Sequence, residues 1–384
     1  MLKGHLPAPE GLAALFAARA PDLAGHQSDA VRRFRQTSFD RFVSAGVPGA
    51  RVEAWKYTPL ANVLPKSFAT KQAVPELGPR ALEYLSALGP CARMVFVDGR
   101  YDPASSDVAS AGNRVRVRRL GALLDNDPDP VLEWLGRGSD ERSLDALNAA
   151  LTDDGCVVDV GPGDGPAVLQ IVSVVTGSGD AARLQSYRHL IRIAAGAEAH
   201  LVELDVALSR QPDVVNRVTR VELAEGARLV QERAQIGSGL AQIISLLDAD
   251  LSADSRLTHS VASLGGALLR NEVRADLLGS NIEATFNGLT LAGTGQHVDH
   301  ALTIRHAAPS SMSDQFYKGV LDGHAKSAFA GRIVVERAAQ KTNAYQSNKT
   351  LLLSPDAEAN AKPELEIYAD DVKCSHGATA GELD

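Results

Sequence analysis

The sequence predicts a mainly β protein, in which a helical and mixed α/β N-terminal part is followed by a parallel β-helix core. From Ala167 almost to the end, apolar and polar residues alternate with a period of two, which is typical of β-strands. The turns between these stretches resemble one another and recur at a nearly constant interval. Gly226 follows Gly196 by 30 residues and Asp254 follows Gly226 by 28, as expected for stacked coils of a solenoid.

The composition agrees with this fold class and restricts the functions. Aromatic residues make up only 5% of the chain, which favours a β-helix with small corners over a β-sandwich, the alternative that the strand pattern leaves open. The formal net charge of −8 and the pI near 5.7 argue against a nucleic-acid partner, because phosphate binding needs clustered cations. A length of 384 residues is enough for two or three units.

The three cysteines, Cys91, Cys156 and Cys374, are odd in number and far apart in the sequence. No disulfide framework is therefore predicted, and a reducing, cytoplasmic location fits best. None of them forms a CxxC motif, so one chain alone does not offer the four thiolates that a structural zinc or an iron–sulfur cluster usually takes. We expect Cys91 and Cys156 to lie buried in strands as structural residues.

The first unit, residues 1–75, is expected to be a helical region followed by a connector. Between Pro9 and Ala45 the apolar residues fall on helical faces, which predicts two short helices. A signal peptide is not predicted, because Pro7, Pro9 and Glu10 interrupt the place of its apolar segment. No stretch approaches the roughly 18 consecutive apolar residues of a membrane span, so no membrane association is expected.

The connector over residues 51–68 has spaced prolines and predicts irregular structure. We expect Glu53, Trp55 and Tyr57 to fix it against the core, since an indole and a phenol combine a large contact area with a polar group. Residues 76–165 then alternate between strand and helix patterns and are predicted to be a mixed α/β region. The strands are expected in 92–99 and 156–165, and the helices in 130–138 and 143–155.

The last unit, residues 166–384, is the predicted β-helix core. A solenoid has open ends, because its terminal coil carries backbone donors and acceptors that must be capped or paired with another chain. Here the last strand-like stretch is "ELEIYADDVKCSHGAT", residues 364–379. Any role of Cys374 is therefore expected close to an open edge.

Cys374 and His376 form the candidate site. Residues two apart in a strand point to the same face, about 6.6–6.8 Å apart along the chain, so both side chains can approach one metal ion while Ser375 faces away. A thiolate and an imidazole suit iron or zinc, but they leave at least two ligand positions for a partner chain. A nucleophilic cysteine activated by His376 or Lys373 is the alternative, and it lacks an orienting third group.

Other polar positions are expected to be structural. His297 and His300 should face opposite sides of a strand, His300 and His306 should share a face, and all three are expected to be surface or interface residues. Ser313, Gln315 and Tyr317 should point to the side opposite Lys318. We expect four further polar residues to form side-chain ladders between coils, namely Gln340, Thr342, Gln346 and Asn348.

Four stretches of the chain are similar to the SufB/SufD family of iron–sulfur cluster assembly proteins. They are "EAWKYTPL" from Glu53, "HALTIRH" from His300, "SDQFYKGVL" from Ser313, and the run from Ala328 that ends in "LEIYADDVKCSHGAT". The N-terminal stretch, and the absence of the cysteine-rich elements of SufB, favour the SufD branch. The resemblance implies a right-handed parallel β-helix behind an N-terminal helical domain.

The same resemblance implies a non-enzymatic scaffold that pairs with a SufB-like subunit and a SufC-like ATPase. It places the corresponding Cys and His at the SufB–SufD interface, where a transient cluster would be shared with the partner rather than bound stably by this chain. The family's C-terminal helical segment, which carries the SufC contact, is expected to be absent here, so SufC binding is the weaker expectation. A homodimeric β-helix binding protein and a β-helix enzyme acting on polysaccharide are the competing hypotheses.

Overall fold

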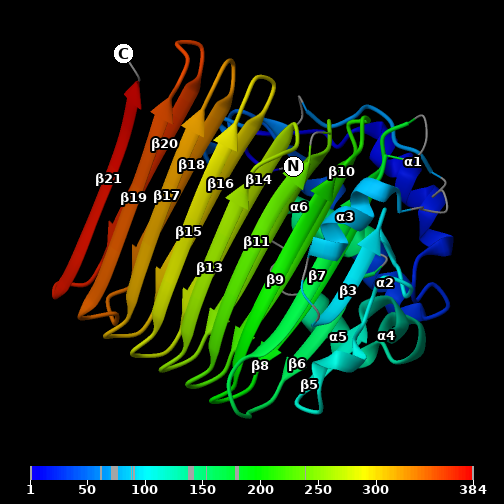
Figure 1. Ribbon diagram of the computed structural model, residues 1–384, viewed down its shortest axis with the longest axis horizontal. Helices are drawn as coiled ribbons and strands as arrows, with labels where there is room; N and C mark the ends of the chain where they lie inside the picture. Colours follow the sequence, from blue (N-terminus) through cyan, green and yellow to red (C-terminus); the bar gives the residue numbers. More distant parts are fainter. Residues whose placement is uncertain are drawn as a thin grey trace.

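The chain forms two long parallel sheets that face each other, with helices gathered at one end (Figure 1). Residues 2–60, 63–70, 77–87, 89, 91–136, 142–152, 154–177, 181–237 and 239–382 are described by this computed structural model. In these ranges, the strands from β6 onward alternate between a ten-stranded and a nine-stranded sheet and pair in parallel within each. This arrangement is a parallel β-helix with two strands in each coil, which confirms the predicted fold class and excludes a β-sandwich.

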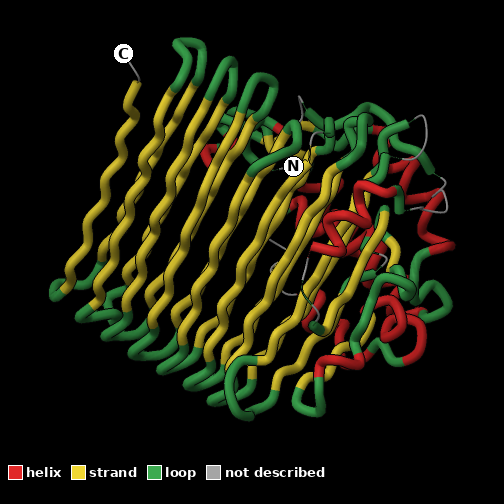
Figure 2. Tube along the Cα trace, in the orientation of Figure 1, coloured by secondary structure: helices red, strands yellow, loops and turns green. Residues whose placement is uncertain are grey.

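The strands of the core are nearly equal in length (Figure 2). The ten-stranded sheet contains β7 (Ala167–Val175), β9 (Glu198–Ala207), β11 (Arg228–Gly237), β13 (Arg256–Ser263), β15 (Glu283–Ala292), β17 (Met312–Leu321), β19 (Thr342–Leu352) and β21 (Val372–Glu382). The nine-stranded sheet contains β8 (Leu184–Ile193), β10 (Val214–Leu223), β12 (Gln242–Leu251), β14 (Leu268–Leu277), β16 (His297–His306), β18 (Lys326–Val335) and β20 (Glu358–Ile367).

Four similar turns explain the repeat in the sequence. Gly196 and Gly226 have φ of 67°, and Asp254 and Asn281 have φ of 59°. Each residue therefore sits in the left-handed region, which glycine, aspartate and asparagine tolerate best. The chain reverses at these positions without a long loop, and so the strands of successive coils stack in register.

The N-terminal part supplies the helices, and the two short helices expected between Pro9 and Ala45 are confirmed. No helix in the described ranges has the length and apolar character that crossing a bilayer demands. The helices are α1 (Glu10–Arg19), α2 (Asp29–Ala45), α3 (Pro79–Ala87), α4 (Leu120–Asn126), α5 (Asp129–Gly136) and α6 (Ser143–Leu151). The strands of this part are β1 (His5–Leu6), β2 (Val47–Pro48), β3 (Ala92–Val97), β4 (Arg100–Tyr101), β5 (Val115–Arg119) and β6 (Cys156–Val160).

These N-terminal elements close one end of the β-helix. Strand β3 pairs with β7, and β6 pairs with β8, so both sheets continue into this region. Helices α1, α2 and α6 pack on the outer face of the nine-stranded sheet, where Leu12, Phe42 and Ala150 join Val214 and Ile244 in one buried cluster. Burial on this scale is the main favourable term in folding.

No described element covers the other end of the β-helix. Strand β21 pairs with β19 on one side and is the last strand of the ten-stranded sheet, and β20 ends the nine-stranded sheet in the same way. Figure 1 shows β21 at the far end of the molecule from the helices. The edge expected from the solenoid argument is therefore present, and it lies on the strand that carries Cys374 and His376.

Candidate functional site

Strand β21 brings Cys374 and His376 to the same face of the last coil. Cys374 lies beside Ala344 of β19, and His376 lies beside Gln346. Both neighbours are buried, with 0% and 3% of their surface exposed, so this face looks into the space between the two sheets. Ser375 lies beside the exposed Tyr345 and faces away. The structure therefore gives the two candidate residues the common orientation that their spacing predicts.

Cys374 is half-buried and packs against the apolar end of the lumen, the space between the sheets. The residues around it are Ile333, Val335, Ala339, Ala344 and Ala369. Burial raises the pKa of the Cys374 thiol, and a hydrogen bond with the backbone of Ala344 offsets this only in part. The thiol is therefore protonated at neutral pH in the free chain, and a bound cation would be needed to favour the thiolate.

His376 is exposed at the rim of the same coil. No cluster of three or more His, Cys, Asp or Glu side chains in the described part of the chain is arranged to hold a metal ion. This chain therefore offers two donors of suitable chemistry, a sulfur and an imidazole nitrogen, and does not complete a coordination shell with its own described residues.

The neighbouring charged residues do not form a catalytic group with Cys374. Lys373 is on the opposite face of β21 and is exposed. Asp371 takes part in the preceding turn through its backbone, where its carbonyl accepts from Lys341 at 2.6 Å and its N–H donates to Gln340 at 2.9 Å. These backbone contacts hold Asp371 in the turn. Among the described residues, no hydrogen bond or ion pair joins a carboxylate to Cys374 or His376, so the nucleophile hypothesis gains no orienting group.

The predicted surface position of the histidines on β16 is wrong for two of them. His300 and His306 are 3% and 0% exposed and point into the lumen, where they contact Thr290 at 3.1 Å and Ser313 at 2.9 Å. Burial lowers the pKa of both rings to about 4, so they are neutral at physiological pH. His297 faces the other side and contacts Thr58 at 3.1 Å, as its odd spacing from His300 predicts.

The polar residues of β17 alternate as expected. Ser313, Gln315 and Tyr317 are buried in the lumen, whereas Lys318 lies on the outer face with its amine 5.1 Å from the Phe316 ring. The expected ladder between coils exists for one of the four further residues. Gln346 donates to Gln315 at 2.8 Å. The Gln340 side chain accepts from the backbone N–H of Asp371 in the next coil, at 2.9 Å, and so joins coils without a side-chain ladder, whereas Thr342 and Asn348 bond within their own coil or turn.

The two other cysteines differ from each other. Cys156 lies in β6, is fully buried, and has its sulfur 3.2 Å from Nδ1 of His189. Burial raises the pKa of this thiol well above its usual value, in agreement with a structural role. The prediction for Cys91 is wrong, because this residue precedes β3 and is only half-buried.

The connector is held against the core by Trp55, as expected. The guanidinium of Arg270 stacks 3.8 Å from the indole centroid and donates to the carbonyl of Ala54 at 2.8 Å. Arg270 also pairs with Asp299, which accepts a hydrogen bond from Thr58.

Glu53 and Tyr57, on either side of Trp55, are more exposed than the indole. Glu53 pairs with Lys362 of β20, while Tyr57 is half-exposed. The connector thus reaches from the closed end to the last coil of the nine-stranded sheet.

Buried ion pairs are the feature that the sequence reasoning missed. In the lumen, Asp205 lies 2.8 Å from Arg217 and 2.5 Å from Arg233. Burial alone would lower the pKa of Arg217, but Asp205 and Glu203 hold it above its ordinary value. A signal existed, because Arg217 shares its side of β10 with the apolar Val215 and Val221.

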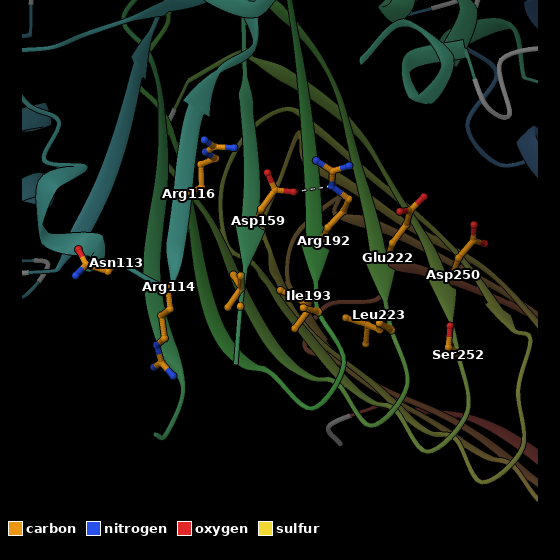
Figure 3. Close-up of a pocket in the computed structure, with 14 residues that line it drawn as sticks. Asn113, Arg114, Arg116, Asp159, Arg192, Ile193, Glu222, Leu223, Asp250 and Ser252 are labelled. Carbon is orange, nitrogen blue, oxygen red and sulfur yellow. Dashed lines mark hydrogen bonds and ion pairs between the residues drawn. The ribbon is translucent and has the colours of Figure 1, made fainter. Parts of the chain in front are cut away.

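A separate groove of about 740 Å³ lies on the outer face of the nine-stranded sheet near the closed end (Figure 3). Asp159 accepts from Arg192 at 2.6 Å and from Arg118 at 2.7 Å, so its charge is already balanced. Glu222 and Asp250 follow on the next strands, and burial and then neighbouring carboxylates raise the pKa of Asp250. The groove lies far from β21, and its charged residues do not converge on one point (Figure 3).

Comparisons with known proteins give a consistent result. Residues 174–384 match the model of the SufBD core domain of the SUF iron–sulfur cluster assembly system, and residues 8–165 match the SufBD N-terminal region. The iron–sulfur cluster assembly protein SufD of Escherichia coli is 30% identical over 91% of this chain and 80% of its own length. A SufBD family protein of Synechocystis sp. is 27% identical over 94% of this chain and 82% of its own length. A chloroplastic protein of Arabidopsis thaliana is 26% identical over 92% of this chain and 76% of its own length.

Proposed function

Because this chain belongs to the SufBD family of iron–sulfur cluster assembly proteins, we propose that it is a SufD-like scaffold subunit, without catalytic activity of its own. It pairs its last coil with a SufB-like subunit, and the two chains form a shared site for nascent clusters. A SufC-like ATPase is the third component that the family suggests, and we assign it no surface on this chain. We expect the complex to work in the cytoplasm.

The observation that carries this proposal is the position of two ligand-type side chains at an open edge. Strands β20 and β21 each pair with one described neighbour, so their outer backbone groups are free to pair with strands of another chain. Cys374 and His376 lie on the outermost of these strands. A partner that continues the sheets would bring its own side chains directly over this pair.

The cluster is the cargo of this site, and the residues of this chain do the following. His376 presents an imidazole nitrogen to an incoming iron, and Cys374 presents a sulfur. Burial raises the pKa of the thiol, so Cys374 keeps its proton until iron or a partner's cation arrives. Because binding then releases that proton, we expect loading to be more favourable at higher pH. The partner supplies the remaining ligands and excludes water from the rim. Two ligands from this chain permit release more readily than four.

The test is co-expression of this chain with SufB-like and SufC-like subunits, followed by affinity purification and measurement of iron and acid-labile sulfide in the complex. We expect His376→Ala to leave the yield of complex unchanged and to reduce its cluster content several-fold. His200→Ala is the matched control, since His200 is also on the ten-stranded sheet and partly exposed, and pairs with Glu232 at 2.7 Å far from β21.

The outcomes separate the parts of the proposal. A His376→Ala complex with full cluster content would contradict the ligand role of His376 but not the pairing of the two subunits. Failure of the wild-type chain to purify with the SufB-like subunit would remove the pairing itself. In that case, light scattering on the chain alone would decide whether the edge pairs with a second copy instead.

A further inference from the structure

A column of side chains inside the lumen ends at His376. Phe286 of β15, Gln315 of β17, Gln346 of β19 and His376 of β21 occupy directly opposite positions on successive parallel strands. In a parallel sheet such positions stack on the same face, so each side chain is the neighbour of the next. Gln346 therefore lies directly beneath His376 and is the nearest side chain of its own sheet on the inner side.

The amide of Gln346 is hydrogen-bonded to the preceding coil. Its Nε2 donates to Oε1 of Gln315 at 2.8 Å, so the amide nitrogen points toward the preceding coil. Gly331 of β18 makes room for this amide, because a Cβ at that position would lie 1.6 Å from Nε2 of Gln346. The carbonyl end of the amide is therefore turned away from Gln315.

This carbonyl oxygen is a buried acceptor without a donor. Gln346 is 3% exposed, and its Oε1 has no hydrogen-bond partner among the described residues. Buried polar groups are nearly always paired, and an unpaired one can mark a place that a water or a further partner fills. Gln315 and Tyr317 of the same lumen also carry unpaired atoms, but Gln346 is the one on the strand next to β21. The polar group next in the column is the imidazole of His376, which is exposed and has a ring N–H to donate.

We propose that Gln346 is the positioning residue for His376, an inference that rests on the proposed ligand role of His376. When the imidazole turns toward the lumen, one ring N–H donates to Oε1 of Gln346. The other ring nitrogen is then unprotonated and faces the rim as a ligand. A metal-binding histidine commonly has its second nitrogen fixed in this way by an acceptor behind it.

Cys374 has no such support. The residue beneath it is Ala344, and the surrounding side chains are apolar. The two donors are therefore prepared differently. The imidazole receives its orientation from the chain, whereas the thiol stays adjustable and becomes a ligand only when it loses its proton.

The test uses the full chain with its histidines labelled with ¹⁵N, and detects ring N–H signals that exchange slowly with water. We expect one signal that is lost in His376→Gln, which assigns it, and also lost in Gln346→Met, which keeps the side-chain length without the acceptor. Gln346→Glu retains an acceptor and is expected to retain the signal. Gln235→Met is the control, because Gln235 is a buried lumen amide on β11 that is bonded to Ser263 at 2.9 Å.

A second readout uses Co²⁺ as a probe on the purified complex. We expect Gln346→Met to weaken Co²⁺ binding by about 10-fold and Gln346→Glu to restore it, as for acceptors behind other metal-binding histidines. The absence of a slowly exchanging His376 signal in the wild-type chain, or its persistence in Gln346→Met, would overturn the inference. These spectra are recorded on the chain without a partner, so their outcome does not depend on whether the chain pairs with a SufB-like subunit.

Discussion

The closed and the open end of the β-helix differ in how their polar side chains are paired. At the closed end, Asp145 of α6 is fully buried and is surrounded by the guanidinium groups of Arg188, Arg220 and Arg142. At the open end, His376 is exposed and Oε1 of Gln346 is unpaired. Beneath the helices the Asp145 carboxylate thus has several charged partners, although Nε of Arg142 and of Arg220 is unpaired there, whereas the polar side chains at and next to β21 have few. This difference is the reason why we propose the open end, rather than the closed end, as the surface for a partner chain.

The largest effect is expected from breaking the closed end. Burial alone would raise the pKa of Asp145, but Arg188, Arg220 and Arg142 hold it below its ordinary value, so the carboxylate is charged. Asp145→Ala would leave Arg188 and Arg220 buried without this counter-charge, which costs about 3–5 kcal/mol of unfolding free energy. Guanidinium denaturation of the free chain measures this loss. Asp356→Ala, at an exposed carboxylate, is the control and should change stability by less than about 0.5 kcal/mol.

The connector between the two ends gives the next largest effect. Trp55→Ala removes a buried indole together with its stacking on Arg270, at an expected cost of about 3 kcal/mol. The connector should then detach from β14 and β16, and limited proteolysis should cut within residues 53–58. Tyr57→Ala serves as comparison, because Tyr57 is half-exposed. Equal protection of the connector in wild type and Trp55→Ala would contradict this role.

The lumen between the ends is expected to be sensitive to acid. Burial lowers the pKa of His300 to about 4, whereas the unfolded chain takes up this proton near pH 6.5. The stability that depends on the neutral ring is present above pH 6.5 and is lost as the pH falls toward 4. Urea denaturation at pH 7.5 and pH 5.0 should show a loss that is about 2 kcal/mol smaller in His300→Gln than in wild type. An equal loss in both proteins would place the acid sensitivity elsewhere.

Much of this contrast could be predicted from the sequence, but not all of it. The period of two and the similar turns that recur at Gly196, Gly226 and Asp254 predicted the coils, because both are local properties of the sequence. The burial of His300 could also have been predicted, since it alternates in step with Val298, Leu302 and Ile304. The ion pairs of Asp145 could not, because they join a helix to strands that are far away in the sequence.

The candidate site shows the same limit. The spacing of Cys374 and His376 was sufficient to predict that they share a face, because a strand alternates by geometry alone. The acceptor on Gln346 was not apparent, since it depends on the register between β19 and β21 and on the space that Gly331 leaves in the opposite sheet. The remaining ligands of the proposed site would come from another chain, so this sequence cannot predict them.

The smallest effect is expected at the open end, and it is the most informative about function. His376→Ala removes an exposed side chain whose proposed hydrogen bond, to Gln346, lies at the solvent-facing rim, so the unfolding free energy of the free chain should change by less than about 1 kcal/mol. Guanidinium denaturation of the two proteins, at the same pH and salt, measures this difference. A loss above about 1 kcal/mol would show that His376 already supports the fold. A stability-neutral substitution that still reduces cluster content in the complex would instead assign its effect to ligand chemistry, because the fold does not depend on that side chain.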